Sequence, residues 1–160
     1  MNMTTTHSPL LPAPLRLPVS LVPPGVHAAV MVATLSRLFA KAIDEGELDY
    51  LEGRSVKVEA VDAGVSFAFG MDDGKLIRRA IDADHDLTLT GKVYDFLLLA
   101  SRREDADTLF FQRRLKMEGD TNLGLEIKNF LDGTDPDDMP FQRPITAGLD
   151  RISRVFERLF

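Results

Sequence analysis

The chain contains no cysteine, and this absence excludes several kinds of chemistry. Without thiols there can be no disulfide, no thiol nucleophile, no cysteine-ligated zinc and no iron–sulfur cluster held by the chain itself. Histidine is scarce: His7, His27 and His85 are the only three, and none stands three or four residues from another. The sequence therefore predicts no metal site and no cofactor, and it is compatible with a reducing cytoplasm.

Basic residues and long hydrophobic runs are also scarce. The 19 Lys and Arg residues are outnumbered by 25 Asp and Glu, which gives a net charge of −6. No basic stripe with interleaved aromatics is present, so nucleic acid is not an expected partner. Prolines interrupt residues 1–26 repeatedly, and we expect neither a signal peptide nor a membrane span there. This proline-rich arm is expected to be extended, either loose or laid on an apolar surface.

The rest of the chain alternates between helical and strand spacing. Apolar residues recur at helical spacing between His27 and Ile43, which predicts an amphipathic helix. Short alternating runs follow, separated by Gly and Asp turns, and predict four strands in a meander and then a fifth strand. These five runs are 47–54, 55–62, 65–70, 75–81 and 86–91.

Helical spacing returns in the second half, interrupted by one more strand. The pattern predicts an α+β domain over 27–133, in which helices cover one face of an antiparallel-rich sheet of five to six strands. The predicted elements are helices at 92–102 and 105–114, a strand at 114–119 and a helix at 121–131.

Three leucines are left over once the core sides of these helices are assigned. Leu98 and Leu99 project away from the expected core side of 92–102, and Leu125 projects opposite the apolar stripe of 121–131. Such residues can pack under a loop or stand singly exposed. Alternatively they line a second apolar surface, such as a cavity or a partner groove. The expected core side of 92–102 consists of Val93, Phe96, Leu97 and Ala100.

No set of residues predicts catalysis. The run DADHD at 82–86 mimics the start of a calcium loop, but Leu87 stands where the loop needs Gly and Val93 where it needs Glu. At 119–124, GDTNLG lacks the Lys of a phosphate-binding loop. Asp120 or Thr121 is better explained as the N-cap of the helix that follows. Nucleophile, base and oxyanion donors do not occur together, so we expect no enzyme activity.

The last segment, 134–160, combines an acidic loop with a basic amphipathic helix. Such helices lie in membrane interfaces, although the same apolar stripe can dock on the domain itself, and the sequence favours neither. The residues expected to face a membrane are Ile145, Leu149, Arg151, Ile152, Arg154, Phe156, Arg158, Leu159 and Phe160.

The strand-to-helix junction LKMEGDTNLGLEIKNFL, at 115–131, resembles the signature of the sterol carrier protein type 2 domain family. The stretches 46–54 and 105–132, with Met139 and Pro140 after them, resemble the members of that family that assist ubiquinone synthesis. The similarity spans roughly residues 27–140, although Ala106 stands where those members usually have Pro.

That resemblance implies a non-catalytic factor that binds prenylated ubiquinone intermediates, especially in the oxygen-independent route. It further implies presentation to ring-modifying partners, including iron–sulfur peptidase-like hydroxylases, in the cytoplasm or on the inner face of its membrane. A general phospholipid or acyl-chain carrier and a protein-interaction scaffold are the alternatives. The residues expected to line a lipid pocket are Phe67, Phe69, Leu89, Leu98, Leu99, Phe110, Met117 and Leu125.

Overall fold

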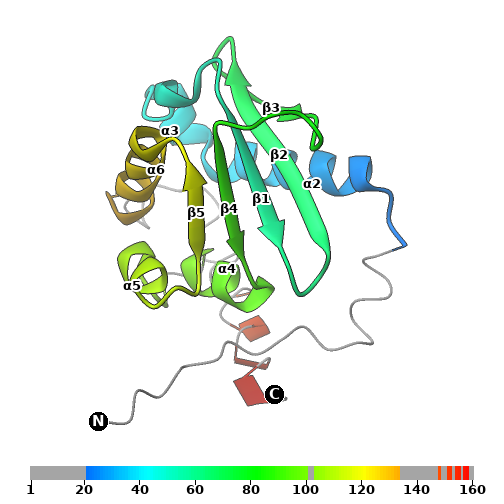
Figure 1. The fold of residues 1–160 in the computed structure, drawn as a ribbon. Helices are drawn as coiled ribbons and strands as arrows, with labels where there is room; N and C mark the ends of the chain where they lie inside the picture. The colour runs from blue at the N-terminus through cyan, green and yellow to red at the C-terminus, as the bar shows by residue number, and fades with distance from the viewer. Residues whose placement is uncertain are drawn as a thin grey trace.

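The computed structural model in Figure 1 describes residues 21–100 and 103–133, and residues 148, 151–152, 154–155 and 157–158 near the end of the chain. Helices and strands alternate irregularly along it, as the predicted α+β class requires. In chain order the elements are α2 (Pro24–Leu38), α3 (Ala40–Asp44), the 3-10 helix η1 (Asp49–Leu51), β1 (Ser55–Ala60), β2 (Val65–Asp72), β3 (Lys75–Arg79), β4 (Leu87–Gly91), α4 (Val93–Ala100), α5 (Ala106–Phe111), β5 (Lys116–Gly119) and α6 (Thr121–Gly133).

The five strands form one sheet in the order β3-β2-β1-β4-β5. Three neighbouring pairs are antiparallel, and β1 and β4 pair in parallel, with Val56 opposite Leu87 and Val58 opposite Leu89. The antiparallel-rich α+β sheet is therefore confirmed. The direction of β4, the fifth predicted strand at 86–91, was not predicted from the sequence. The loop between β3 and β4 carries the chain back to the other end of the sheet before β4 begins.

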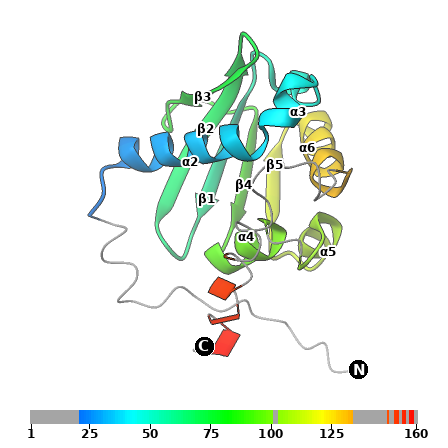
Figure 2. The same cartoon turned by 180° about the vertical axis from the view of Figure 1, so that it is seen from behind.

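The helices cover one face of this sheet. Figure 2 shows α2 crossing that face, with α3 and α6 beside it. Val56, Phe69 and Met71 point to this side, because side chains two apart on a strand share a face. The other face is polar: Lys57 and Lys116 form ion pairs with acidic side chains two residues along their own strands. One apolar and one polar face are typical of an antiparallel-rich sheet.

Two predicted elements differ in the structure. Residues 47–54 form no strand; η1 lies there, and Glu52 alone bridges to Met71. Leu48 and Leu51 are each only 3% exposed, so the apolar spacing is three residues, that of a 3-10 turn. The helix predicted at 27–43 starts earlier, at Pro24, and is divided into α2 and α3 at Phe39, where ψ reaches 19°.

Candidate functional site

Two apolar clusters occupy the helix-covered side of the sheet. The upper cluster joins α3, η1 and α6 to the sheet, and the lower cluster joins α4 to α5 and the start of β5. No described residue belongs to both clusters. The buried members of the upper cluster are Leu48, Leu51, Val56, Met71, Leu87, Leu123 and Ile127, and those of the lower cluster are Tyr94, Leu98, Leu109 and Leu115.

The residues predicted to line a lipid pocket divide between these clusters. Partly buried Phe69, Leu89 and Met117 pack against the upper cluster, and partly buried Leu99 and Phe110 against the lower one. Buried Phe67 belongs to neither cluster, and its ring stacks on Phe69 with the ring centroids 6.1 Å apart. We name the two clusters, together with Phe67, the candidate lipid site. Whether these side chains touch lipid stays a prediction.

The prediction of which side of α4 faces the core was wrong. Tyr94, Asp95 and Leu98 are the described α4 residues that are buried, whereas Val93, Phe96 and Leu97 are half-buried. Leu98 is therefore a core residue of the lower cluster, although the sequence predicted that it projects away from the core. The cause is that α4 turns its polar Asp95 inward to bind Arg114, which rotates the helix away from the orientation that hydrophobicity alone predicts.

Leu125 projects away from the sheet, as the helical spacing predicts, and is 53% exposed. Its neighbours Leu123 and Ile127 are buried in the upper cluster. Leu125 consequently belongs to neither cluster. The helical period showed correctly that this side chain leaves the core, but it could not show whether anything covers it.

The junction between β5 and α6 holds one side of this region in place. The carboxylate of Asp120 accepts hydrogen bonds from the backbone N–H groups of Asn122 and Leu123, at 2.9 and 3.0 Å, which confirms Asp120 as the N-cap. These bonds, and the Arg54 guanidinium 2.6 Å away, lower the pKa of Asp120. At Gly124 an added Cβ would lie 2.2 Å from the Met117 sulfur, so glycine lets α6 approach the sheet closely.

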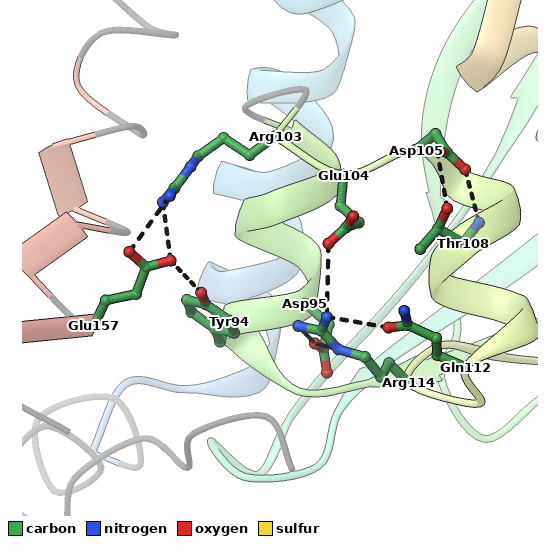
Figure 3. Close-up of polar contacts among 9 residues, drawn as sticks. All are labelled: Tyr94, Asp95, Arg103, Glu104, Asp105, Thr108, Gln112, Arg114 and Glu157. Atoms are coloured by element: carbon green, nitrogen blue, oxygen red, sulfur yellow. Dashed lines mark hydrogen bonds and ion pairs between the residues drawn. The ribbon is translucent and has the colours of Figure 1, made fainter. Parts of the chain in front are cut away.

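A buried ion pair fixes the lower cluster. The guanidinium of Arg114 contacts the Asp95 carboxylate at 2.7 and 2.8 Å, and these side chains are 9% and 1% exposed. Glu104 lies 3.8 Å from the same guanidinium, which also stands 5.8 Å from the centre of the Tyr94 ring (Figure 3). The pair joins α4 to the start of β5, and a pattern of apolar residues cannot reveal it.

The end of the chain is attached to α4 by a second polar group. The Tyr94 hydroxyl donates to the Glu157 carboxylate at 2.5 Å, and Arg103 binds the same carboxylate at 3.1 Å (Figure 3). The hydrogen bond from Tyr94, followed by Arg103, lowers the pKa of Glu157. Burial and this bond raise the pKa of Tyr94 to about 12. Glu157 therefore attaches its own described part of the last segment to α4.

The residues predicted to face a membrane are only partly described. Arg151, Ile152, Arg154 and Arg158 are exposed, and Ile152 keeps 54% of its surface accessible. The other five predicted residues lie outside the described part of the chain: Ile145, Leu149, Phe156, Leu159 and Phe160.

One exposed aromatic residue was missed by the sequence reasoning. Phe111, the last residue of α5, is 91% exposed, while its neighbour Phe110 is half-buried. Adjacent residues on a helix point about 100° apart, so both rings of an FF pair cannot enter the same core from a six-residue helix. That geometry was the signal available in the sequence.

The described residues contain neither a candidate metal site nor a candidate membrane-spanning helix. Among residues 21–100, 103–133 and the described positions near the end, no three His, Asp or Glu residues gather in a way that could hold a metal ion. Within the same residues, no helix combines the length and the apolar character needed to cross a membrane. The site consists of packed apolar side chains beside the Arg54–Asp120 and Arg114–Asp95 ion pairs.

Comparison with known proteins defines the class. Residues 33–132 match the SCP-2 sterol transfer family, and the chain belongs to that family. The structure is similar to that of "UbiJ-SCP2 Ubiquinone synthesis protein", with a TM-score of 0.55 over 68% of this chain and 95% of that one, at 16% identity.

Within the family, the chain is similar in sequence to the ubiquinone biosynthesis accessory factor UbiT. It is 40% identical over 129 residues to UbiT of Escherichia coli strain K12 and to that of Escherichia coli O157:H7. The aligned part covers 81% of this chain and 74% of each relative. The resemblance predicted from the junction at 115–131 is thereby confirmed.

Proposed function

We propose that the chain is a non-catalytic, lipid-binding accessory factor of ubiquinone synthesis. It holds the prenyl tail of an intermediate in the candidate lipid site and presents the aromatic ring to modifying enzymes. The observation that carries the proposal is the 40% identity to UbiT over 129 residues, which include both apolar clusters and the junction between β5 and α6. The oxygen-independent route and the iron–sulfur peptidase-like hydroxylases are the pathway and the partners that we propose for it.

The arrangement of apolar groups supports a lipid ligand. A prenyl tail needs a long surface without hydrogen-bonding groups, and each CH₂ withdrawn from water contributes roughly 0.8 kcal/mol. Of the proposed lining residues, Phe67, Phe69 and Leu89 come from the sheet, and Leu99 and Phe110 come from α4 and α5. Binding by burial alone requires no chemical step from the protein.

The exposed side chains near the end of the chain support a role at a membrane. Ile152 and Val155 are each 54% exposed, and Arg151 and Arg158 are exposed on the same segment. We propose that this segment contacts the inner face of the cytoplasmic membrane while Glu157 keeps it attached to α4. The protein would then act as a cytoplasmic, peripheral partner of the bilayer.

Mass spectrometry of organic extracts tests the lipid-carrying function. Protein is purified without detergent, and its extract is compared with those of two matched variants, Leu99→Asp and Leu125→Asp. Leu99 packs against the lower cluster, whereas Leu125 is exposed on the outer side of α6. A charge placed against an apolar ligand costs several kcal/mol. Prenylated phenols should therefore be found with the wild type and with Leu125→Asp, and should be lost from Leu99→Asp.

Circular dichroism melts accompany the extracts, so that lipid loss is scored only for folded protein. Equal prenylated lipid in both variants would remove Leu99 and its neighbours from the site. Phospholipid alone in every extract would favour a general phospholipid or acyl-chain carrier. A folded wild-type protein with no lipid would favour a protein-interaction scaffold.

A further inference from the structure

Four large apolar side chains stand exposed at one end of the molecule. Phe111 is 91% exposed, Val61 is 57% exposed, and Ile152 and Val155 are each 54% exposed. They belong to three segments that are far apart in the sequence: the β1–β2 turn, the end of α5 and the end of the chain. A single exposed apolar residue is common, but several gathered at one end of a domain indicate an interaction surface.

Helix α4 brings these three segments together. The carboxylate of Asp62, next to Val61, accepts the backbone N–H of Val93 at 2.9 Å. Arg114, three residues after Phe111, binds Asp95 on α4, and Glu157 binds Tyr94 on the same helix. Figures 1 and 2 both show α4, α5 and the described end of the chain at the same end of the sheet. We name this surface, with Val61, Phe111, Ile152 and Val155, the α4 end.

The α4 end carries exposed arginines without ion-pair partners among the described residues, although the whole chain has a net charge of −6. Arg113, Arg151 and Arg158 are exposed, and none forms an ion pair with a described residue. Among the acidic groups nearby, Asp62 and Asp95 are buried, Glu104 lies 3.8 Å from Arg114 and Asp107 lies 2.7 Å from Lys128, while Asp105 is exposed. The Glu157 carboxylate is bound by Arg103.

The opposite end of the sheet is acidic. Glu47, Asp49, Asp72 and Asp73 are exposed around η1 and the β2–β3 turn. Glu52, which accepts the backbone N–H of Asp73 at 2.7 Å, lies in the same region. Because the acidic groups and the free arginines lie at opposite ends of the strands, a negatively charged surface would attract the α4 end and repel the other end.

We propose that the α4 end docks on an anionic lipid bilayer, with the Phe111 ring inserted among the headgroups and acyl chains. Aromatic side chains flanked by arginine suit that boundary, because the ring is buried while the cations remain beside the lipid phosphates. This proposal rests on the proposed lipid-carrying function, for which it supplies the place where the lipid is exchanged.

A second exposed apolar surface, on α2, shows which features distinguish the α4 end as the surface for a bilayer. The outer side of α2 exposes Val26, Val30 and Met31, but its basic neighbours stand at opposite ends of the helix: Arg37 in the last turn, and Arg78, which donates to the Gly25 carbonyl at 3.1 Å, at the first. Apolar surface without clustered arginine lacks the charge complementarity that an anionic bilayer offers. The α4 end combines both features, which is why a bilayer is assigned to that end and not to α2.

Tryptophan fluorescence tests the insertion directly, because the chain contains no tryptophan. Phe111→Trp is compared with Val30→Trp, both in the full chain, during titration with vesicles of phosphatidylcholine and roughly one third phosphatidylglycerol, which gives the bilayer an anionic surface. The emission of Trp at 111 should shift to the blue and be quenched by brominated acyl chains. Trp at 30 should keep its emission. A shift at 30 but not at 111 would overturn the proposal.

Vesicle cosedimentation measures the energetic role of the same residues. Phe111→Ser is expected to weaken binding about tenfold, and Arg113→Gln about fivefold, whereas Val30→Ser leaves it unchanged. Added salt should weaken binding of the wild type. Wild-type binding by Phe111→Ser would overturn the proposal, and so would a dimer in sedimentation velocity that Phe111→Ser dissociates.

Lipid extracted from Phe111→Ser separates this proposal from the proposed function. Phe111 points away from the candidate lipid site, so the variant should retain prenylated lipid while losing vesicle binding. If the wild type carries no prenylated lipid but still needs Phe111 for vesicle binding, the lipid-carrying function fails and docking stands. If lipid is carried and Phe111 does not matter for vesicles, docking fails alone.

Discussion

Replacement of Arg114 by Met tests how the lower cluster is held together. In the folded protein the guanidinium makes contacts of 2.7 and 2.8 Å with Asp95, whose side chain is 1% exposed. Met fills a similar apolar volume but leaves the Asp95 carboxylate inside the protein without its cation. Removal of one partner of a buried ion pair typically costs about 3–5 kcal/mol. This is a large part of the 5–15 kcal/mol that stabilises an ordinary domain.

Urea denaturation followed by circular dichroism is the assay. With a slope of roughly 2 kcal/mol per M, a loss of about 4 kcal/mol moves the midpoint down by about 2 M. Lys116→Met is the matched control, because Lys116 is 2.7 Å from Glu118 but both side chains are more than half exposed. An exposed pair contributes about 0–1 kcal/mol. If Arg114→Met and Lys116→Met shifted the midpoint equally, the structural role given to the buried pair would be refuted.

Two further predictions concern the backbone and pH. Gly119→Ala should lower the urea midpoint strongly, because φ is +122° and an added Cβ would lie 2.3 Å from the carbonyl oxygen of Asp86; a wild-type midpoint would contradict this. The Tyr94–Glu157 contact should weaken as pH falls through the lowered pKa of Glu157 and, at the other extreme, as pH rises through about 12, where Tyr94 ionises. Hydrogen exchange at 151–158 in wild type and Glu157→Gln measures this, and a pH-independent wild type would contradict it.

Much of the fold follows from local patterns. Helical spacing predicted the helical regions and the outward position of Leu125, and the residue type of Asp120 predicted an N-cap. These features depend on nearest neighbours along one element, so a sequence read element by element contains them. The similarity of the junction at 115–131 to a known family predicted the class.

Features that depend on two distant segments were not predictable in this way. The parallel pairing of β4 with β1 depends on where a loop returns the chain, and no period in the sequence records that. The inward side of α4 is set by Arg114, 19 residues after Asp95, which outweighs the apolar pattern of the helix itself. The strand predicted at 47–54 failed because Leu48 and Tyr50 alternate as in a strand, whereas the common burial of Leu48 and Leu51, three residues apart, fits a 3-10 turn.

Calorimetric titration of lipid-stripped protein with prenylated phenols of increasing prenyl length tests the central claim most directly. If the tail is buried between the two apolar clusters, affinity should rise about tenfold or more with each added isoprene unit until the site is filled. Phenols without a prenyl tail should not bind measurably. An affinity that is independent of prenyl length, in protein shown to be folded, would contradict the account.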